Sequence, residues 1–294
     1  MRVKSYILIL IPVSLLLLVA ASFIYEWGFD ENTEVASYQT NDTGEILTHP
    51  YPPSFDHPLG TDRKGQDLLL RILNGAKYTI LFVLSVGLVR ILVGMLLGAL
   101  LTFMPKRIKD FVQLFLTPYV NVPAFILVYF LAYIFFAVPT DDGGLQLIFI
   151  QFVILTFVGV PSLVLLFSNE FQDGLKHEYI QASYQLGASK KHIVIRHLLP
   201  VLRNRFTIVF LQQIIASLIL LIHLGVFRIY IGGQAEGSVS IDEEILLSKS
   251  GEWAGMIGQS VFDIVTAPWI VLAPGMAFVL LIVMLNTMIR LIRV

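Results

Sequence analysis

The sequence predicts an all-α, polytopic membrane protein with six transmembrane helices and both termini in the cytoplasm. Three observations support this fold class: a composition poor in charge, six apolar stretches of membrane-spanning length, and an uneven distribution of lysine and arginine. Of the 294 residues, 56% are hydrophobic and 14% are charged, and the mean hydropathy is +0.78. A soluble domain carries about a quarter charged residues, so lipid is the solvent that this composition fits.

The composition also excludes several classes of function. The formal net charge is −1, which gives no reason to expect nucleic acid as a partner. The chain has no cysteine. Disulfides, thiolate metal sites and cysteine nucleophiles are therefore excluded, and the redox compartment stays undetermined.

Six segments are long and apolar enough to cross a membrane, which takes about 20 residues of helix. Short polar stretches separate them. The predicted spans are Ser5–Trp27, Ala76–Phe103, Phe111–Val138, Leu145–Phe167, Phe206–Phe227 and Pro268–Ile289.

The basic residues set the direction of these spans. With the N-terminus in the cytoplasm, 13 of the 20 lysine and arginine residues lie in cytoplasmic segments. Cytoplasmic loops carry the excess of these residues, so both termini are predicted to be inside. The first span alone also resembles a signal peptide, with a basic start and small residues at Ala20 and Ala21. Its apolar run is longer than the core of such a peptide, and we expect it to remain as a helix.

The outside segment after the first span contains a patterned run, His57–Asp67, which reads HPLGTDRKGQD. Pro58 and Gly60 favour a turn, and Thr61 or Asp62 can cap the helix that follows. Apolar residues at helical spacing over 68–76 then predict a short interfacial helix leading into the second span. His49 and His57 beside carboxylates raise a metal site as an alternative. No metal-binding spacing supports it, and a capped turn is the interpretation we adopt.

The cytoplasmic loop 168–205 is the longest inside segment, and its pattern predicts two short helices. The first runs from Glu178 and ends at Gly187, because glycine readily adopts the left-handed conformation past a helix end. Tyr179, Ala182, Ser183 and Leu186 are expected to share one face of it. Ser189 can cap the second helix, which has Pro200 near its end. The residues alone fit either an amphipathic hairpin on the inner leaflet or a docking element for a cytoplasmic partner.

Ionisable residues at membrane depth are few, and Arg90 is the central one. It lies near the middle of the second predicted span, and His223 in the fifth span is the other candidate. An arginine there faces a bundle interior or a water-filled cavity. Arg90 either lines a solute path and meets a carboxylate, or it serves structure by pairing with a backbone carbonyl or an acid of another subunit.

Two of these segments match a known family. The run Glu178–Pro200, EYIQASYQLGAS followed by HIVIRHLLP, resembles the EAA loop of ABC importer permeases. The run HPLGTDRKGQD is similar to the HPLGTD segment of the dipeptide, oligopeptide and nickel permeases, and Glu252-Trp253 with the last span resembles the end of those proteins. The chain thus resembles the HPLGTD-containing, C-type permease subunit of this family, over nearly its whole length.

This resemblance implies a type I ABC importer permease fold with three parts. Residues 1–27 are the first transmembrane helix, and residues 28–75 are an extracellular segment with an interfacial helix. Residues 76–294 are the ABC permease transmembrane domain of five helices, with the EAA-like coupling loop 168–205 and the extracellular loop 228–267. Gln66 departs from the family pattern, and the polar run Arg228–Gly251 is an insertion that we expect to be external and partly ordered. It either contacts a solute-binding protein or covers the mouth of the solute path, and the alternative is a passive loop.

The resemblance further implies a multi-pass protein of the cell membrane that forms half of the path for a peptide or similar small solute. The expected partners are a second homologous permease, two ATP-binding cassette ATPases, an extracytoplasmic solute-binding protein and membrane lipid. No catalytic site, metal or cofactor is expected in the chain, which has no GxxxxGK[ST] motif, so ATP binds to the partner ATPases. The residues expected to contact the ATPase or shape the coupling loop are Glu178, Ala182, Gly187, Ala188, Ile195 and Pro200.

Two other classes of function remain as alternatives. A secondary transporter driven by an ion gradient needs ionisable groups at membrane depth, and the predicted spans contain no clear buried aspartate or glutamate. A membrane-bound sensor or hydrolase lacks any supporting nucleophile, metal motif or signalling module.

The charge distribution yields a direct prediction about topology. A reporter that works only outside the cell, fused after Val294, is expected to be inactive, because the excess of basic residues holds that end inside. The same reporter inserted between residues 240 and 243 is the matched positive control. Activity of the fusion after Val294 would contradict the predicted orientation.

Overall fold

The computed structural model describes residues 2–28, 39–40, 46–47, 49–136, 144–240 and 243–293, with side chains over 6–28, 49–136, 144–235 and 246–293. The chain divides into two compact units. The first contains residues 1–83, 132–151 and 218–294, and the second contains 84–131 and 152–217. Three long helices contribute residues to both units.

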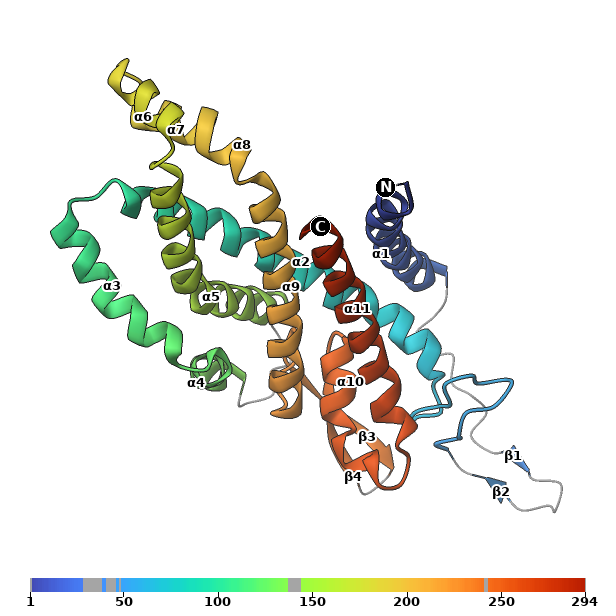
Figure 1. The fold of residues 1–294 in the computed structure, drawn as a ribbon. Helices are drawn as coiled ribbons and strands as arrows, with labels where there is room; N and C mark the ends of the chain where they lie inside the picture. Colours follow the sequence, from blue (N-terminus) through green and yellow to red (C-terminus); the bar gives the residue numbers. More distant parts are fainter. Residues whose placement is uncertain are drawn as a thin grey trace. The chain divides into compact units, whose positions relative to one another are not determined.

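Five helices of the described residues are long and apolar enough to cross a membrane (Figure 1). A sixth span results if α3 (Lys106–Asn121) and α4 (Ala124–Phe136) form one bent crossing. The prediction of a polytopic helical membrane protein is therefore confirmed, while the orientation of its termini stays a prediction. The five long helices are α1 (Arg2–Gly28), α2 (Leu68–Thr102), α5 (Gly144–Gly174), α9 (Arg203–Val226) and α11 (Trp269–Arg293).

The second predicted span begins earlier than expected. The residues predicted to form a separate interfacial helix are the first turns of α2, which is continuous over 35 residues from Leu68. The predicted boundary at residue 75 lies inside this helix. At 1.5 Å per residue, α2 is about 50 Å long, well beyond the roughly 30 Å of a hydrocarbon core. Its N-terminal turns therefore extend past the hydrocarbon layer unless the helix is strongly tilted.

The third predicted span is not one straight helix. α3 and α4 are bent by 86° at a short break. The cause is Pro123, because a proline disfavours helical conformation in the residue before it. Val122 accordingly has an extended backbone, with φ −76° and ψ 132°. The end of this predicted span, residues 137–138, lies outside the described residues.

The fourth span is longer than predicted. α5 continues to Gly174, so the first residues of the predicted loop 168–205 are helical. Phe171 in this extension is fully buried and packs with Phe167, with ring centroids 6.4 Å apart. Burial of these rings explains why the helix does not end where the apolar run ends.

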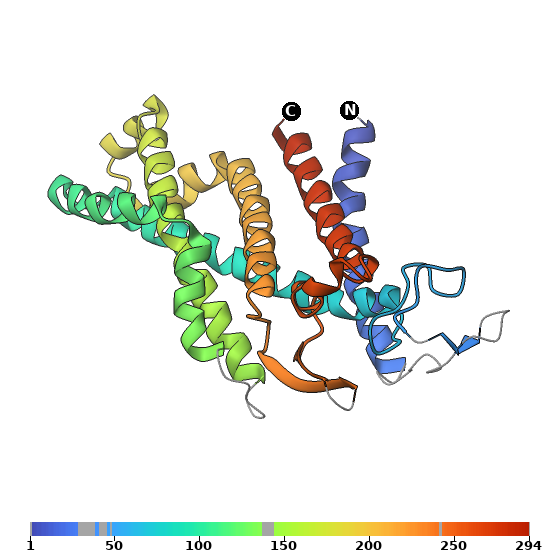
Figure 2. The same ribbon diagram turned by 90° about the horizontal axis from the view of Figure 1, so that it is seen from below.

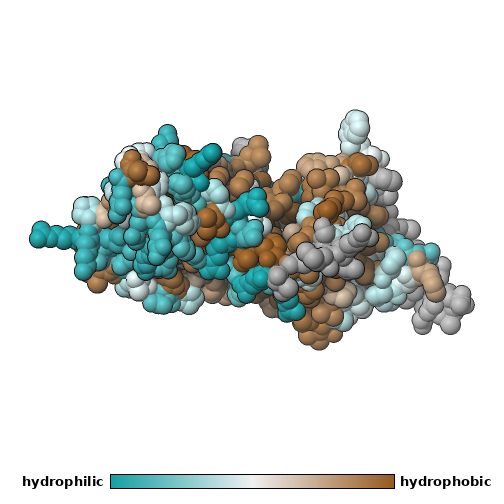
Figure 3. Space-filling view, turned by 45° about the horizontal axis from the view of Figure 1, so that its top comes forward, coloured by the Kyte–Doolittle hydropathy of each residue, from teal (hydrophilic) through white to brown (hydrophobic). Residues whose placement is uncertain are grey.

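Beyond α5, the chain forms a short helical hairpin. It consists of α6 (Glu178–Gln185), α7 (Lys190–Ile193), a π-helical turn (Val194–Leu198) and α8 (Leu199–Val201). We call this segment, 178–201, the α6–α8 hairpin. Figure 3 shows hydrophilic residues gathered over this end of the second unit. Both predicted helices of the loop are confirmed.

The first unit contains strands that the all-α prediction missed. β3 (Gln234–Ser240) and β4 (Glu243–Ser248) form an antiparallel hairpin, with Gln234 opposite Ser248 and a register shift between Ser238 and Ser240. They make up most of the polar insertion Arg228–Gly251, which is thus ordered in its described part. Residues 241–242 at its tip lie outside the described residues. β1 (Gln39–Thr40) and β2 (Ile46–Leu47) form a second short pair.

The first unit is held together by α10 (Trp253–Gln259), which packs on β4 and on α11. The Trp253 indole donates to the Ile72 carbonyl of α2 at 2.7 Å, and its backbone N–H donates to Thr79 Oγ1 at 3.1 Å. α1 also packs along α11, and the two helices lie side by side in Figures 1 and 2. α10 therefore joins the N-terminal part of α2 to α11.

In the second unit, glycines let α2 and α5 approach closely. A Cβ atom at Gly94 would lie 2.5 Å from Leu163 Cβ, and one at Gly98 would lie 2.8 Å from Phe167 Cβ. Carbon atoms do not approach this closely without displacement of the backbone. Small residues are the usual solution for close helix pairs in membranes, where packing replaces the hydrophobic effect.

This contact predicts the effect of one added methyl group. Gly94→Ala is expected to destabilise the protein by about 1–3 kcal/mol, because the overpacked helices must separate. Gly275→Ala in α11 is the matched control, since nothing lies within 4 Å of its added Cβ. That variant is expected to gain about 0.5–1 kcal/mol from helix propensity. Thermal unfolding in detergent measures both, and equal midpoints would contradict the close contact.

Candidate functional site

The turn inside the α6–α8 hairpin is built by glycine in a left-handed conformation. Gly187 has φ +87°. Its N–H donates to the Tyr184 carbonyl at 3.0 Å, and the Ala188 N–H donates to the Ser183 carbonyl at 3.1 Å. These two bonds form a Schellman motif, which satisfies the last carbonyls of α6. The predicted role of Gly187 in ending the helix is confirmed.

The second half of the hairpin begins at the predicted cap. Ser189 Oγ accepts from the His192 N–H at 3.2 Å. The helix then widens into a π-helical turn, where the Leu199 N–H donates to the Val194 carbonyl. Pro200 has no N–H to continue the ladder, and the helix ends one residue later. Single π-turns of this kind frequently occur at functional sites.

The hairpin is anchored by a small apolar core. Ile180, Ile193 and Leu198 are each at most 1% exposed and belong to one cluster with Phe167 and Phe171 of α5. An ion pair between Arg205 Nε of α9 and Glu170 Oε1 of α5, at 2.8 Å, lies beside this core. The hairpin is therefore packed onto the adjoining ends of α5 and α9.

The face of α6 predicted to hold Tyr179, Ala182, Ser183 and Leu186 is mostly presented outward. Tyr179 is 49% exposed and Leu186 is 90% exposed. The residue of α6 that packs inward is Ile180, which the prediction did not single out, because the core beneath the hairpin receives this branched side chain.

The six predicted coupling residues separate into two groups. Ala188 is half-buried against the core cluster. The other five are exposed on the hairpin. Further exposed apolar side chains, which were not predicted as coupling residues, lie on the same hairpin. The sequence signal for these residues is an apolar side chain at a position out of phase with the buried ones. The exposed predicted residues are Glu178, Ala182, Gly187, Ile195 and Pro200, and the additional apolar ones are Tyr184 and Val201.

Arg90 is buried within the second unit, with 2% of its surface exposed. Its Nε and Nη2 donate to the Leu155 carbonyl at 3.0 and 2.6 Å. Its Nη1 donates to Gln213 Oε1 and Ser217 Oγ, both at 3.2 Å. A Cβ at Gly159 would lie 2.3 Å from Arg90 Nε, so this glycine makes room for the guanidinium. Pairing with a backbone carbonyl is what we expected if Arg90 serves the structure. Its alternative role, lining a solute path, stays a prediction.

The segment before α2 forms a capped turn, although the capping residue differs from the prediction. Asp67, and not Thr61 or Asp62, caps α2 by accepting from the Leu69 N–H at 2.8 Å. Asp62 instead closes the preceding turn through the N–H groups of Lys64 and Gln66. The reason is proximity, because only Asp67 directly precedes the helix. His57 Nδ1 lies 2.9 Å from Asp67 Oδ2, within the capped turn.

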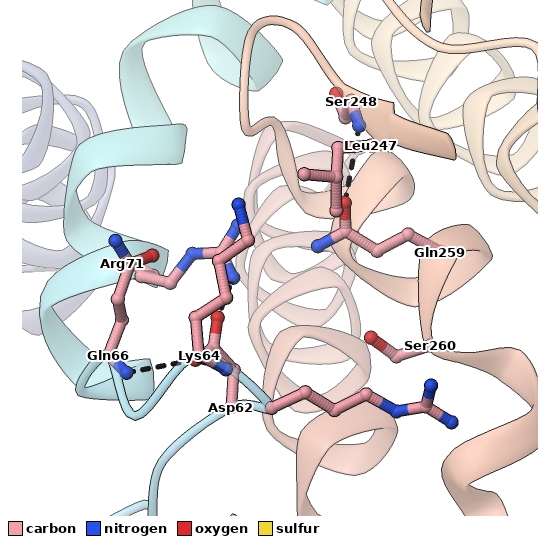
Figure 4. A pocket seen from close by; sticks show the side chains of 9 residues that line it. Asp62, Lys64, Gln66, Arg71, Leu247, Ser248, Gln259 and Ser260 are labelled. Atoms are coloured by element: carbon pink, nitrogen blue, oxygen red, sulfur yellow. Dashed lines mark hydrogen bonds and ion pairs between the residues drawn. The ribbon is translucent and has the colours of Figure 1, made fainter. Parts of the chain in front are cut away.

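A polar pocket lies where this turn meets β4 and α10. Its cavity volume is about 140 Å³. Figure 4 shows the side chains of Lys64, Arg71 and Gln259 pointing toward the same space. Arg71 pairs with Asp62, and Arg63 Nε donates to Asp263 at 2.7 Å. The residues lining the pocket are Asp62, Arg63, Lys64, Gln66, Arg71, Leu247, Ser248, Gln259 and Ser260.

A buried carboxyl, Glu252, stands at the start of α10. It is 1% exposed, accepts from the Gly255 N–H and accepts from the Ile231 N–H at 3.1 Å. Burial raises the pKa of Glu252 to about 7, and the hydrogen bonds from backbone N–H groups oppose this rise. Glu252 therefore joins the base of the β3–β4 hairpin to α10.

Comparisons with known proteins show the family of the chain. The family model for the binding-protein-dependent transport system inner membrane component matches residues 90–293. The chain belongs to this family. The matched region begins at Arg90 and contains the α6–α8 hairpin, α9, the β3–β4 hairpin and the last span.

Curated relatives within this family are similar over much of the chain. The inner membrane ABC transporter permease protein YejE of Escherichia coli K12 is 31% identical over 215 residues, which are 72% of this chain and 59% of that protein. The di/tripeptide transport system permease protein DppC of Pseudomonas aeruginosa is 24% identical over 230 residues, 78% of this chain and 68% of that protein. The probable D,D-dipeptide permease DdpC of Escherichia coli K12 is 26% identical over 238 residues, 80% and 71% respectively.

The contacts of Arg90 predict a structural cost when it is replaced. Arg90→Gln is expected to lower stability by about 1–3 kcal/mol, because a shorter side chain cannot reach the Leu155 carbonyl and both polar partners together. Arg90→Lys is expected to restore little, since an ammonium lacks the guanidinium fork. Thermal unfolding of the purified permease in detergent tests this, and an unchanged midpoint for Arg90→Gln would refute it.

The raised pKa of Glu252 predicts that the stability of the protein depends on pH. Its pKa is about 7 in the folded protein and about 4.3 when unfolded, so the folded state binds more protons between these values. The free energy of unfolding contributed by this group is therefore highest below about pH 4.3 and falls as pH rises toward 7. In Glu252→Gln this contribution is absent. Unfolding midpoints of both proteins from pH 5 to 8 should converge or cross as pH changes, and parallel curves would contradict the prediction.

Proposed function

We propose that this chain is one permease subunit of an ATP-driven importer and forms half of a translocation pathway. The observation that carries this proposal is the α6–α8 hairpin, a capped element packed on α5 and α9 with an outward face that is apolar and charged. Membership in the binding-protein-dependent transport family supports it.

The hairpin would act as the mechanical link to an ATPase. Glu178 at the start of α6 supplies a charged contact, and Leu186 and Ile195 supply apolar ones. Ala182 permits close approach, while Gly187, Ala188 and Pro200 fix the shape of the element. Because Ile180, Ile193 and Leu198 hold it against Phe171, closing of an ATPase dimer would push on α5 and α9 as rigid bodies.

The proposed assembly has four kinds of partner. A second homologous permease completes the path, and two ATP-binding cassette subunits bind beneath the two permeases and hold the ATP. An extracytoplasmic solute-binding protein delivers the solute, and lipid surrounds the exposed apolar helices. We propose that the β3–β4 hairpin and the adjacent pocket, with Lys64 and Arg71, contact the binding protein.

The solute is proposed to be a peptide or a similar small molecule. Of the relatives named above, DppC is named as a di/tripeptide permease and DdpC as a probable D,D-dipeptide permease. The name of YejE states no substrate. Uptake of labelled di- and tripeptides into cells that carry or lack the gene tests the substrate class. Equal uptake would remove the peptide assignment.

Co-purification in a mild detergent tests the assembly. Intact protein should retain the ATPases, the second permease and the binding protein. Deletion of residues 236–246 should release the binding protein alone, whereas Glu178→Lys with Leu186→Asp should release the ATPases alone. Purification of the intact chain without any ATPase, from cells that express all subunits, would contradict the proposal.

Gly187 gives the sharpest single-residue prediction for coupling. Gly187→Val should uncouple ATP hydrolysis from uptake or prevent assembly, because its φ of +87° costs a β-branched residue more than about 1 kcal/mol. No atom lies within 4 Å of an added Cβ, so the effect is conformational. Gly187→Asn, which tolerates this backbone, is the control and should retain most uptake. Normal uptake by Gly187→Val at normal expression would defeat the prediction.

A further inference from the structure

One helix of the described chain, α3, has a polar stripe at a depth where lipid cannot solvate it. None of its residues is buried. Gln113, Thr117 and Asn121 recur at intervals of four, so they share one side of the helix. Gln113 is half-buried, and Thr117 and Asn121 are exposed.

From Phe111 onward, the other sides of α3 are apolar and are distinct from this stripe. Val112 and Leu116 pack against the cluster of Leu101, Val160 and Val164. Phe111 and Phe115 form a second apolar side, and they are 60% and 62% exposed. α3 therefore presents one side to protein, one to an apolar environment and one that requires polar partners.

The topology places this stripe inside the membrane. α2 and α5 each cross once, and both lead to basic segments that the charge distribution assigns to the same side. The chain between them must therefore cross as well, and α3 and α4 are the only helices available among the described residues. α4 has 13 residues, about 20 Å, which is too short to cross a hydrocarbon core of roughly 30 Å alone. α3 must cover the remaining depth.

Polar side chains at that depth face water, protein or a solute. Pro118 adds to the demand, since it removes the helical donor for the Leu114 carbonyl. The break at Val122–Pro123 ends the stripe with a further interruption of the backbone ladder. Broken helices are tolerated at membrane depth where they line a water-filled cavity.

We propose that Gln113, Thr117 and Asn121 line the water-filled solute path and hydrogen-bond the backbone of a passing peptide. This rests on the proposed function. Side-chain amides and a hydroxyl each donate and accept, and a peptide backbone offers both partners in every residue. Such a stripe recognises peptides without selecting their side chains. Arg90, with its donors bound inside the second unit, is not needed for this contact.

The natural absence of cysteine makes the test direct. Single cysteines replace Gln113, Thr117 or Asn121, and Phe111→Cys and Phe115→Cys are matched controls on the same helix. Each variant is assembled in the complete complex in membrane vesicles and treated with a charged, membrane-impermeant methanethiosulfonate reagent. Thiols in apolar surroundings stay protonated and unreactive, so the stripe cysteines should react about tenfold faster or more than the controls.

A transported dipeptide should then slow labelling of the stripe by several-fold and leave the controls unchanged. Stripe cysteines that react no faster than Phe111→Cys and Phe115→Cys, in vesicles with normal uptake, would overturn the proposal. Fast labelling that peptide does not slow, again with normal uptake, would overturn the peptide contact. Fast labelling without any peptide uptake in the unmodified complex would instead reject peptide as the solute, and the contact with it.

Discussion

The close approach of α2 and α5 is the constraint on which the second unit depends. Gly94 and Gly98 remove the Cβ atoms that would keep these helices apart, and Gly159 opens the space that the Arg90 guanidinium fills. The same approach places Phe167 beside Gly98, and Phe167 continues into the core that receives the α6–α8 hairpin. The contact between α2 and α5 therefore underlies three features: the packing of these helices, the burial of Arg90 and the anchoring of the α6–α8 hairpin.

Arg90 shows how a membrane protein can hold a charge without a carboxylate. Its four hydrogen bonds go to one backbone carbonyl, one amide and one hydroxyl. Burying a cation is costly unless its donors are satisfied, and here two helices, α5 and α9, supply the acceptors. The cation therefore links α2, α5 and α9 directly.

Much of the fold was predictable because its signals are local. Apolar runs located every long helix, and Gly187 and Ser189 located the hairpin turn and its cap, since each acts through its own backbone. Pro123 is a sequence signal for the break between α3 and α4. It was missed because the span was predicted from the apolar composition of a long segment, which one proline hardly changes. The register of α6 was not predictable, because Ile180 is selected by Phe171 and Leu198, which are distant contacts. The β3–β4 hairpin was missed because its strands, QAEGSVS and EEILLS, show no regular alternation of large apolar and polar residues.

The outward face of the α6–α8 hairpin has a consequence for the life of the protein in a cell. Leu186 and Tyr184, at 90% and 54% exposed, are apolar side chains on a largely hydrophilic surface that is not lipid-facing in the proposed topology. Uncovered apolar surface of this kind recruits chaperones and proteases. Copies of this permease made in excess of the proposed ATPase would be degraded. The supply of the ATPase, and not the rate of permease synthesis, would then set the abundance of the permease.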